Sequence, residues 1–250
     1  MKVSIITVVH NRVATIEKAM ISVLQQSYSP IEYIVIDGNS NDGTQAKVRS
    51  FDNYITKFIS APDKGMYDAL NKGIEMASGD IIGVLHSDDF FADETIVEQI
   101  AEAFKADQSL DAVYGDVSFV NANDHNKITR YYSSEKFNNS KFEFGYMPAH
   151  PSFFCRRECF EKFGNYRTDM KIAADFELLL RFLAIHNIRS KYLPVCTTIM
   201  STGGKSTAGL RSIITINKEF NQALKEHGFK TSMIKLYSRY FIKWKEFFGN

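Results

Sequence analysis

The chain has few cysteines, almost no net charge and no long apolar run. Its 250 residues include three cysteines, Cys155, Cys159 and Cys196, and no Cys-x-x-Cys pair. This odd number at these spacings predicts packed free thiols in a reducing compartment rather than a disulfide framework or a zinc site. A formal net charge of +1 gives no overall attraction for nucleic acid, so an anionic ligand has to be held by local features.

Membrane spans and several enzyme classes are also disfavoured by what is missing. No apolar stretch approaches the ~20 residues of a membrane span. The apolar run over residues 3–9 follows a single Lys and has no small-residue cleavage site, so it is too short for a secretory signal. We therefore expect a cytoplasmic protein. No Gly-x-Gly-x-x-Gly follows this run, which disfavours a dinucleotide-binding dehydrogenase.

The first half of the chain alternates strand-like and helix-like segments. Apolar, β-branched runs predict strands over residues 3–9, 33–37, 55–60 and 81–85. Stripes at helical spacing predict helices over residues 16–24, 66–77 and 96–104. This alternation is typical of an α/β fold with a mostly parallel sheet flanked by helices, in which ligands bind at the carboxyl ends of the strands.

The second half is less regular. We expect a strand over residues 112–120, a polar loop over 121–139, a helix over 174–186 and a basic helical region from about Leu210. No repeat and no low-complexity linker interrupts the chain. The predicted organisation is therefore one catalytic domain over residues 1–208 and a helical C-terminal extension over residues 209–250.

Paired acids form the strongest chemical signal. Asp88 and Asp89 directly follow the predicted strand 81–85. Adjacent carboxylates repel each other unless a cation or hydrogen-bond donors compensate them, and a divalent cation shared with phosphate oxygens is one solution. By itself the pair is as consistent with a turn. Because Asp37 and Asp63 also follow strands, three acidic clusters are expected at one edge of the sheet, where a ligand crevice would lie.

Taken together, these segments resemble the family-two glycosyltransferases, which have the GT-A fold. The resemblance covers about residues 1–205, and its joint pattern is specific although each fragment alone is weak. The matching stretches are Val3 to Arg12, Glu32 to Thr44, Asp63 to Gly73, Ala77 to Asp80 and Leu85 to Asp89. The resemblance implies a GT-A-type α/β fold and a nucleotide-sugar donor.

By position, the resemblance also implies roles for these acids. Asp37 would accept from the imide of the nucleobase, and Asp63 would be a second acid on the base side, with a helix cap as its alternative. Asp88 would meet the ribose or the metal, and Asp89 the metal, either Mn or Mg, which neutralises the departing diphosphate. The remaining donor-side positions are Thr7, Val9, Asn11, Arg12, Lys64, Gly65 and Asp68.

A catalytic base is expected at the start of the predicted helix 174–186. Inverting sugar transfer needs a base that deprotonates the acceptor hydroxyl, and the resemblance implies Asp175 for this role. Relatives often carry an acid immediately before it, where this chain has Ala174. The alternative is that Asp175 is a carboxylate favoured by the helix dipole alone.

Two positions are open between a ligand contact and a structural role. His150, between Pro148 and Pro151, resembles the segment that shapes the acceptor side, and it would contact the acceptor or a phosphate. A single histidine is as often structural. Lys205, in the loop Ser201 to Ser206, would hold phosphates of the donor, or belong to a plain surface loop.

The C-terminal segment, Met233 to Phe248, interleaves basic and aromatic residues. Such a helix suits a membrane interface with anionic lipid, and the equal alternative is a helix packed on the domain. In the first case the protein would meet a lipid-linked acceptor as a peripheral protein at the inner face of the membrane.

The sequence thus predicts an inverting, metal-dependent glycosyltransferase. It would use a nucleotide-diphosphate sugar, with UDP favoured, to glycosylate a glycan or lipid-linked glycan. The family resemblance suggests assembly of a surface polysaccharide such as O-antigen or capsule. The rivals are a sugar-nucleotide-binding protein without turnover, supported by Ala174, and a sugar nucleotidyltransferase. The latter is disfavoured because His10, Asn11 and Arg12 stand where that class has a Gly-rich phosphate loop.

Overall fold

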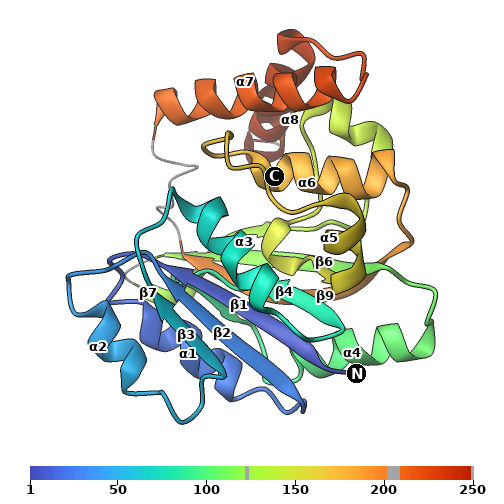
Figure 1. Cartoon of the computed structure of the whole chain (residues 1–250). Helices are drawn as coiled ribbons and strands as arrows, with labels where there is room; N and C mark the ends of the chain where they lie inside the picture. Colours follow the sequence, from blue (N-terminus) through green and yellow to red (C-terminus); the bar gives the residue numbers. More distant parts are fainter. Residues whose placement is uncertain (122–123, 202–208, 249–250) are drawn as a thin grey trace.

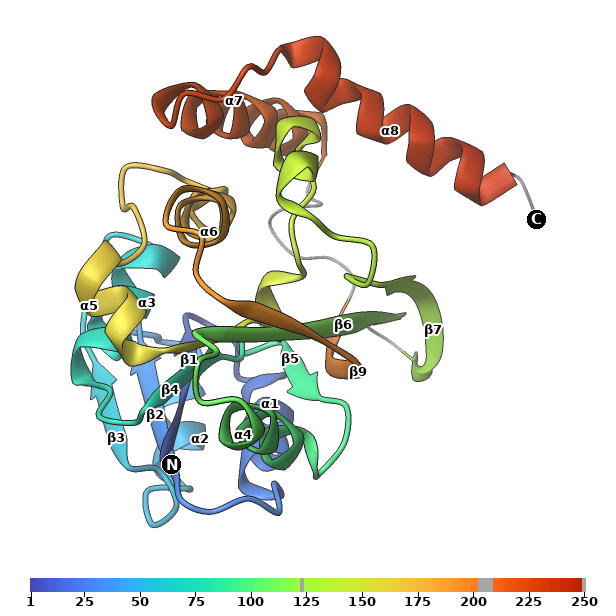
Figure 2. The same cartoon turned by 90° about the vertical axis from the view of Figure 1, so that its right-hand side faces the viewer.

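A computed structural model describes residues 1–121, 124–201 and 209–248 of the chain. One sheet lies between two layers of helices, and two C-terminal helices form a further layer at one end (Figure 1, Figure 2). The strands are β1 (Val3–Val9), β2 (Ile31–Asp37), β3 (Lys57–Ser60), β4 (Ile81–Val84), β5 (Asp89–Phe91), β6 (Ala112–Asn121), β7 (Asp124–Tyr132), β8 (Phe154–Arg156) and β9 (Ser190–Ser201). The α-helices are α1 (Ile16–Leu24), α2 (Thr44–Arg49), α3 (Met66–Met76), α4 (Ile96–Ala106), α5 (Arg157–Phe163), α6 (Ala174–Leu179), α7 (Leu210–Glu226) and α8 (Met233–Phe248).

Strands β3, β2, β1 and β4 lie side by side in that order and run parallel. The side chains of β2, β1 and β4 are buried on both faces, whereas β3, at the edge of the sheet, is partly exposed. Ile6 and Ile36 pack in the core beneath α3, whereas Ile5 and Val35 pack in the core beneath α1 and α4. Successive residues of a strand point to opposite faces, so two-sided burial explains why these strands appear as continuous apolar runs in the sequence. The predicted α/β fold is confirmed.

The other half of the sheet is mixed. β8 runs antiparallel to both β4 and β6, and β9 pairs parallel to β6 and antiparallel to β5. The prediction of a loop over residues 121–139 was wrong, because β7 forms a hairpin with β6 within that range. Ile128 of β7 is 64% exposed. A strand at the edge that is largely solvated lacks the apolar alternation by which strands are found in a sequence.

The two halves of the sheet meet where β4 pairs with β8. Gly83 of β4 lies opposite Phe154 of β8, and a Cβ at position 83 would collide with the Phe154 ring. Phe154 is fully buried and stacks on Phe91 of β5. Glycine at position 83 therefore allows an aromatic side chain to pack directly over the junction.

The C-terminal helices pack on the rest of the fold through α6. Phe220 of α7 stacks on Phe176 of α6, with 3.8 Å between ring centroids, and Leu224 and Leu236 are fully buried in the same core. The predicted helical tail is thus present. The helix expected over residues 174–186 is also present, but its second part, Leu180–Ile185, is a π-helix. Within the described ranges, none of the helices combines the length and apolar character that a membrane span requires.

Candidate functional site

Asp37 ends β2 at the carboxyl edge of the parallel strands, and its side chain is fully buried. Its carboxylate accepts three hydrogen bonds: from Ser40 N (3.0 Å), Ser40 Oγ (2.5 Å) and Ser60 Oγ (2.6 Å). Asp37 therefore ties the loop after β2 to the end of β3. In this geometry its oxygens face protein donors, so contact with a nucleobase would require these donors to be exchanged.

The loops that follow β1 and β2 are hydrogen-bonded to each other. Asn11 adopts a left-handed conformation (φ 52°), which asparagine tolerates better than most residues. Its backbone N–H donates to Ser40 Oγ (2.7 Å), and its Oδ1 accepts from Asn41 N (2.9 Å). Arg12 N donates to Thr44 Oγ1 (2.9 Å), while the Arg12 side chain is exposed. The Arg12 guanidinium donates to Asn11 O (3.2 Å) within this loop, and its exposed side can meet an anion.

Two of the predicted donor-side residues have side chains that point into the core. Thr7 is fully buried and its Oγ1 accepts from Tyr33 Oη (3.1 Å), and Val9 is buried beneath α1. A ligand can reach these two positions only through the backbone.

The segment before α3 brings Asp63 back to the end of β2. Gly65 has φ +121°, and its N–H donates to Asp63 Oδ1 (2.9 Å). A Cβ at Gly38 would collide with the other oxygen of Asp63, so glycine is needed for this close approach. Lys64 N donates to Asp68 Oδ2 (3.1 Å), and this hydrogen bond, aided by Lys72, lowers the pKa of Asp68. Asp68 therefore stabilises the first turn of α3, with its own oxygens engaged by protein groups.

Asp88 lies in the connection between β4 and β5, and Asp89 is the first residue of β5. Asp89 is 3% exposed, and its Oδ2 is buried without a hydrogen-bond partner in the described part of the chain. Burial, together with the charge of Asp88, raises the pKa of Asp89 well above its usual range. An unpartnered buried carboxylate oxygen is costly unless a ligand compensates it. The pair fits a hard cation, although no group of three acidic, histidine or cysteine ligands occurs among the described residues.

Asp175 lies in the first turn of α6, on the other side of the site. Its Oδ1 accepts from Phe176 N (2.8 Å) and from Tyr67 Oη of α3 at the longer distance of 3.4 Å. Burial raises the pKa of Asp175 to about 6, opposed by the Phe176 N–H and by His86. A carboxylate with a pKa near 6 is ionised at neutral pH and still basic enough to accept a proton, as a general base requires.

His86 is close to both acidic groups. Burial and the neighbouring His150 lower the pKa of His86 to about 4, while the charges of Asp88 and Asp175 act in the opposite direction. Its imidazole stacks on that of His150, with 6.0 Å between centroids. The structure therefore brings the paired acids after β4 and the predicted base on α6 to one site.

His150 itself is buried, 6% exposed, with its Nε2 2.6 Å from Tyr166 Oη. Burial lowers its pKa to about 4, so the ring is neutral at physiological pH. This arrangement favours the structural alternative for His150 over direct contact with a phosphate. Lys205 lies outside the described residues, and its role stays a prediction.

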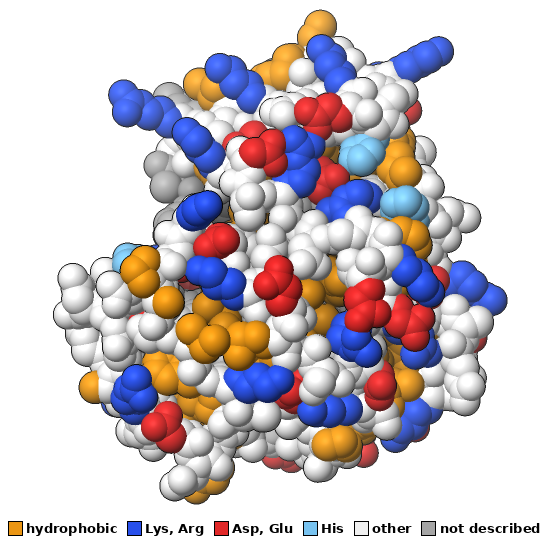
Figure 3. Space-filling model, viewed as in Figure 1, with side chains coloured by type: hydrophobic (Ala, Val, Ile, Leu, Met, Phe, Trp, Pro, Cys, Tyr) orange, Lys and Arg blue, Asp and Glu red, His pale blue; other side chains and the backbone are white. Residues whose placement is uncertain are grey.

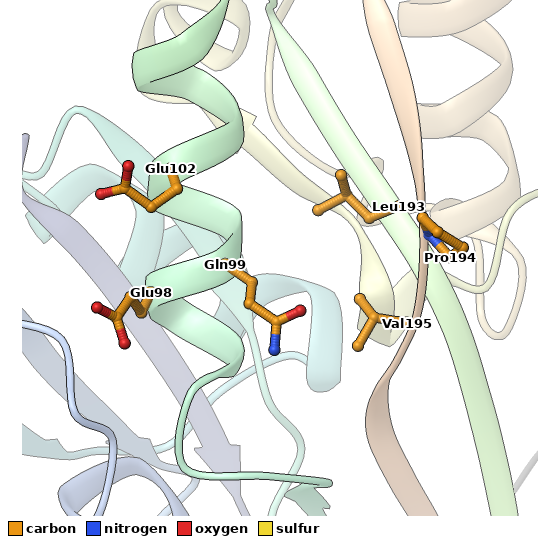
Figure 4. Close-up of a pocket in the computed structure, with 6 residues that line it drawn as sticks. All are labelled: Glu98, Gln99, Glu102, Leu193, Pro194 and Val195. Carbon is orange, nitrogen blue, oxygen red and sulfur yellow. The ribbon is translucent and has the colours of Figure 1, made fainter.

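Sequence reasoning missed two residues that contact this site. Tyr67 Oη donates to Ile172 O (2.5 Å) and lies 3.4 Å from Asp175 Oδ1, and Glu219 of α7 accepts from backbone N–H groups just before Asp175. Tyr67 lies within the matching stretch Asp63 to Gly73 but was given no role, and no local pattern marks Glu219, because both act through contacts between distant segments of the chain. A pocket of about 420 Å³ lies elsewhere, between α4 and β9, and none of the predicted site residues lines it (Figure 4).

Comparison with known proteins identifies the family. Residues 4–164 match the model of glycosyl transferase family 2, and the chain belongs to this family. A Mycobacterium tuberculosis protein named only as an uncharacterized glycosyltransferase is 35% identical over 72% of this chain and 68% of its own length. A PGL/p-HBAD biosynthesis glycosyltransferase of Mycobacterium bovis is 25% identical over 88% of this chain and 83% of its own length.

Solved structures share the fold at lower identity. Staphylococcus aureus TarS, residues 1–349, superposes with a TM-score of 0.69 at 15% identity, over 98% of this chain and 73% of that one. The mannosyltransferase PcManGT of Pyrobaculum calidifontis, solved with GDP-Man and Mn²⁺, gives a TM-score of 0.66 at 20% identity, over 89% of this chain and 64% of that one. The chain thus has the GT-A fold expected from its sequence.

Proposed function

We propose that the protein is an inverting glycosyltransferase that moves a sugar from a UDP-sugar to a hydroxyl of a glycan or lipid-linked glycan. The observation that carries this proposal is that the charges of Asp88 and Asp175 both act on the buried His86, while Asp89 N donates to His86 O (3.1 Å). Inversion needs an anion-binding side for the leaving diphosphate and a base on the opposite side of the sugar. TarS has been solved with UDP-GlcNAc, which supports a UDP-sugar as the first donor to test.

Asp175 is the proposed base. It would take the proton of the acceptor hydroxyl as that oxygen attacks the anomeric carbon, while the bond from this carbon to the diphosphate breaks. Tyr67 Oη lies 3.4 Å from the same carboxylate and donates its one proton to Ile172 O (2.5 Å). Burial raises the pKa of Tyr67, so its hydroxyl stays protonated and holds the turn before Asp175. Ala174, where relatives often carry an acid, is fully buried, so proton transfer rests on Asp175 alone.

The proposed cofactor is Mn²⁺ or Mg²⁺, and Asp89 and Asp88 would hold it. When bound, such a cation neutralises charge on the leaving diphosphate. The unpartnered Oδ2 of Asp89 supports this assignment, because a buried carboxylate oxygen needs a compensating positive group. Arg12, exposed at the neighbouring strand end, is the proposed protein cation for the phosphates.

Thermal stabilisation by nucleotides tests the donor class without an acceptor. UDP, GDP, CMP and dTDP are each added with and without MnCl₂, and the melting temperature is measured. A ligand that binds only the folded state raises this temperature. We expect a rise with UDP that needs Mn²⁺. Release of UDP from UDP-GlcNAc then separates an enzyme from a sugar-nucleotide-binding protein without turnover. No rise with any nucleotide would contradict the proposal.

Peripheral membrane contact through α8 is a second part of the proposal. Lys and Arg side chains gather along the top of the face in Figure 3, over α7, and α8 extends away from the domain in Figure 2. Its first half is packed: Leu236 is buried, and Arg239 donates to Gly145 O (2.7 Å). A chain ending at Tyr240 keeps these contacts. It should sediment less with anionic lipid vesicles than the full chain, and equal sedimentation would argue for a purely packed helix.

A further inference from the structure

The segment that leads into Asp175 is held by a carboxylate from the C-terminal extension. Glu219 of α7 is 9% exposed, and its side chain accepts from three consecutive backbone N–H groups. Oε1 accepts from Lys171 N (2.9 Å), and Oε2 accepts from Ile172 N (3.0 Å) and Ala173 N (2.9 Å). Hydrogen bonds to an ionised acceptor are stronger than neutral ones, and three on one carboxylate restrain a short segment of backbone tightly.

The local sequence cannot supply this restraint. α6 begins after Ala173, and neither Ala173 nor Ala174 has a side-chain acceptor to cap the helix. The buried N–H groups of this turn need a partner from elsewhere. Glu219 provides it from a segment about 45 residues further along the chain.

The same turn is held from its other side by α3. Tyr67 Oη donates to Ile172 O (2.5 Å), so one peptide segment is bound both by α3 and by α7. The residue after Glu219 adds a second contact, since Phe220 stacks on Phe176, the residue that follows Asp175. Two neighbouring residues of α7 therefore contact the chain on either side of Asp175.

We infer that Glu219 is a positioning residue for Asp175, and that α7 is a working part of the catalytic site. This inference rests on the proposed role of Asp175 as the base. A base must lie within hydrogen-bond reach of the acceptor hydroxyl, and small displacements of catalytic groups are costly in rate. Loosening the turn 171–173 should therefore slow transfer without weakening donor binding, whose predicted residues lie on other elements.

Glu219→Gln is the first test, because it keeps the shape of the side chain and replaces one accepting oxygen by an amide that cannot accept. With UDP-GlcNAc and MnCl₂, or with the donor that the nucleotide screen selects, we expect kcat to fall about tenfold. The KM for the donor and the stabilisation by UDP should stay within twofold. Glu226→Gln is the matched control, since Glu226 is on the same helix but bonds Arg167 at the surface. Its kcat should equal that of the wild type.

A readout independent of activity is amide hydrogen exchange over residues 171–173 in the nucleotide-free protein. Exchange should speed up in Glu219→Gln and remain unchanged in Glu226→Gln. Glu219→Asp keeps the charge with a shorter reach and should recover part of both kcat and protection. If Glu219→Gln does not fold, Tyr67→Phe tests the same turn from the α3 side and should lower kcat with unchanged UDP binding.

The outcomes separate this inference from the proposed function. Faster exchange in Glu219→Gln with wild-type kcat would mean that the carboxylate is only structural, and the inference would be overturned. The inference would also be overturned if kcat fell, the KM for the donor rose and the affinity for UDP fell by similar factors. A wild-type protein that binds no nucleotide and releases no UDP would instead overturn the proposed function, whatever the exchange data show.

Discussion

The acidic residues of the candidate site have different surroundings in the two halves of the molecule. In the parallel half of the sheet, Asp37 has three protein donors and Asp63 has a backbone donor from Gly65. At the start of β5 in the mixed half, Asp89 has an unpartnered buried oxygen, and on the neighbouring α6 burial raises the pKa of Asp175. In the first arrangement, the carboxylates hold the loops at the carboxyl edge of the parallel strands. In the second, the carboxylates lie in an environment that disfavours their charge.

This contrast suggests that the two groups of carboxylates have different functions. Carboxylates that are satisfied within the protein stabilise loops, and those that are buried and under-compensated are candidates for binding cations or protons. We therefore assign donor recognition to the parallel half and metal binding and proton transfer to the mixed half. Variants of single residues on each side should therefore change either donor binding or the rate of transfer.

The largest effect is expected from Asp175→Asn. Loss of a general base costs about 10²–10⁴-fold in rate, so kcat for transfer should fall by that factor while UDP binding is unchanged. The melting temperature at pH 7 should not fall, because burial raises the pKa of Asp175 and the folded state therefore disfavours its ionised form. An equal loss of UDP binding, measured by calorimetry, would mean that Asp175 contacts the donor and would contradict its assignment to proton transfer.

Asp89→Ala should act on the metal instead. We expect UDP affinity in the presence of MnCl₂ to fall about tenfold or more, and the Mn²⁺ dependence of UDP stabilisation to disappear. Binding measured without metal should change little. Calorimetric titration of UDP with and without MnCl₂ checks both statements, and Asp107→Ala is the control, since Asp107 accepts from Ser109 N (3.0 Å) after α4 and is none of the predicted site residues. An unchanged Mn²⁺ effect would remove Asp89 from the metal site.

The pH dependence of kcat should follow the ionisation of the buried carboxyl of Asp175. Asp175 must be ionised to accept a proton, and burial raises its pKa to about 6. At saturating donor, kcat should therefore be constant above pH 7 and fall about tenfold for each pH unit below about 6. A limb near pH 4, the range of an exposed aspartate, would mean that the base is solvated in the working enzyme.

The smallest effect is expected from Gly38→Ala in the parallel half. The new Cβ collides with the Asp63 carboxylate, and overpacking of this kind costs about 1–3 kcal/mol of stability. The KM for the donor should rise several-fold with kcat retained. Gly228→Ala, where φ is +79° but no atom lies within 4 Å of the new Cβ, should lose stability only. A fall in kcat at Gly38→Ala with unchanged KM would contradict the assignment of this edge to the donor.

The same contrast explains how far the sequence could predict the structure. Strands β1, β2 and β4 of the parallel half are buried on both faces, and each appears as an apolar run; the predicted strand 3–9 matches β1 residue for residue. In the mixed half, β7 is an exposed edge strand with a polar sequence, and it was predicted as a loop. The periodicity of apolar residues indicates which segments are buried. It therefore does not identify an exposed strand that is stabilised mainly by hydrogen bonds to its neighbour.

The site shows the same limit. Asp88, Asp89 and Asp175 stand at strand ends or a helix start, and the sequence marks them. The sequence does not predict the contacts around these residues. Asp37 accepts from Ser60, and Glu219 accepts from the backbone of residues 171–173. Both contacts join segments that meet only in the folded chain. Position in the sequence therefore predicted where these acids lie along the strands and helices better than it predicted what each one contacts.

The pairing of β5 with β9 has a consequence for the order in which the protein assembles during synthesis. β5 follows β4 within a few residues, yet Asp89 pairs with Met200, about 110 residues later. A ribosome adds roughly 5–20 residues per second, so this strand waits on the order of 5–20 s for its partner. The nascent chain is therefore expected to complete its parallel sheet well before the strand that carries Asp89 is paired.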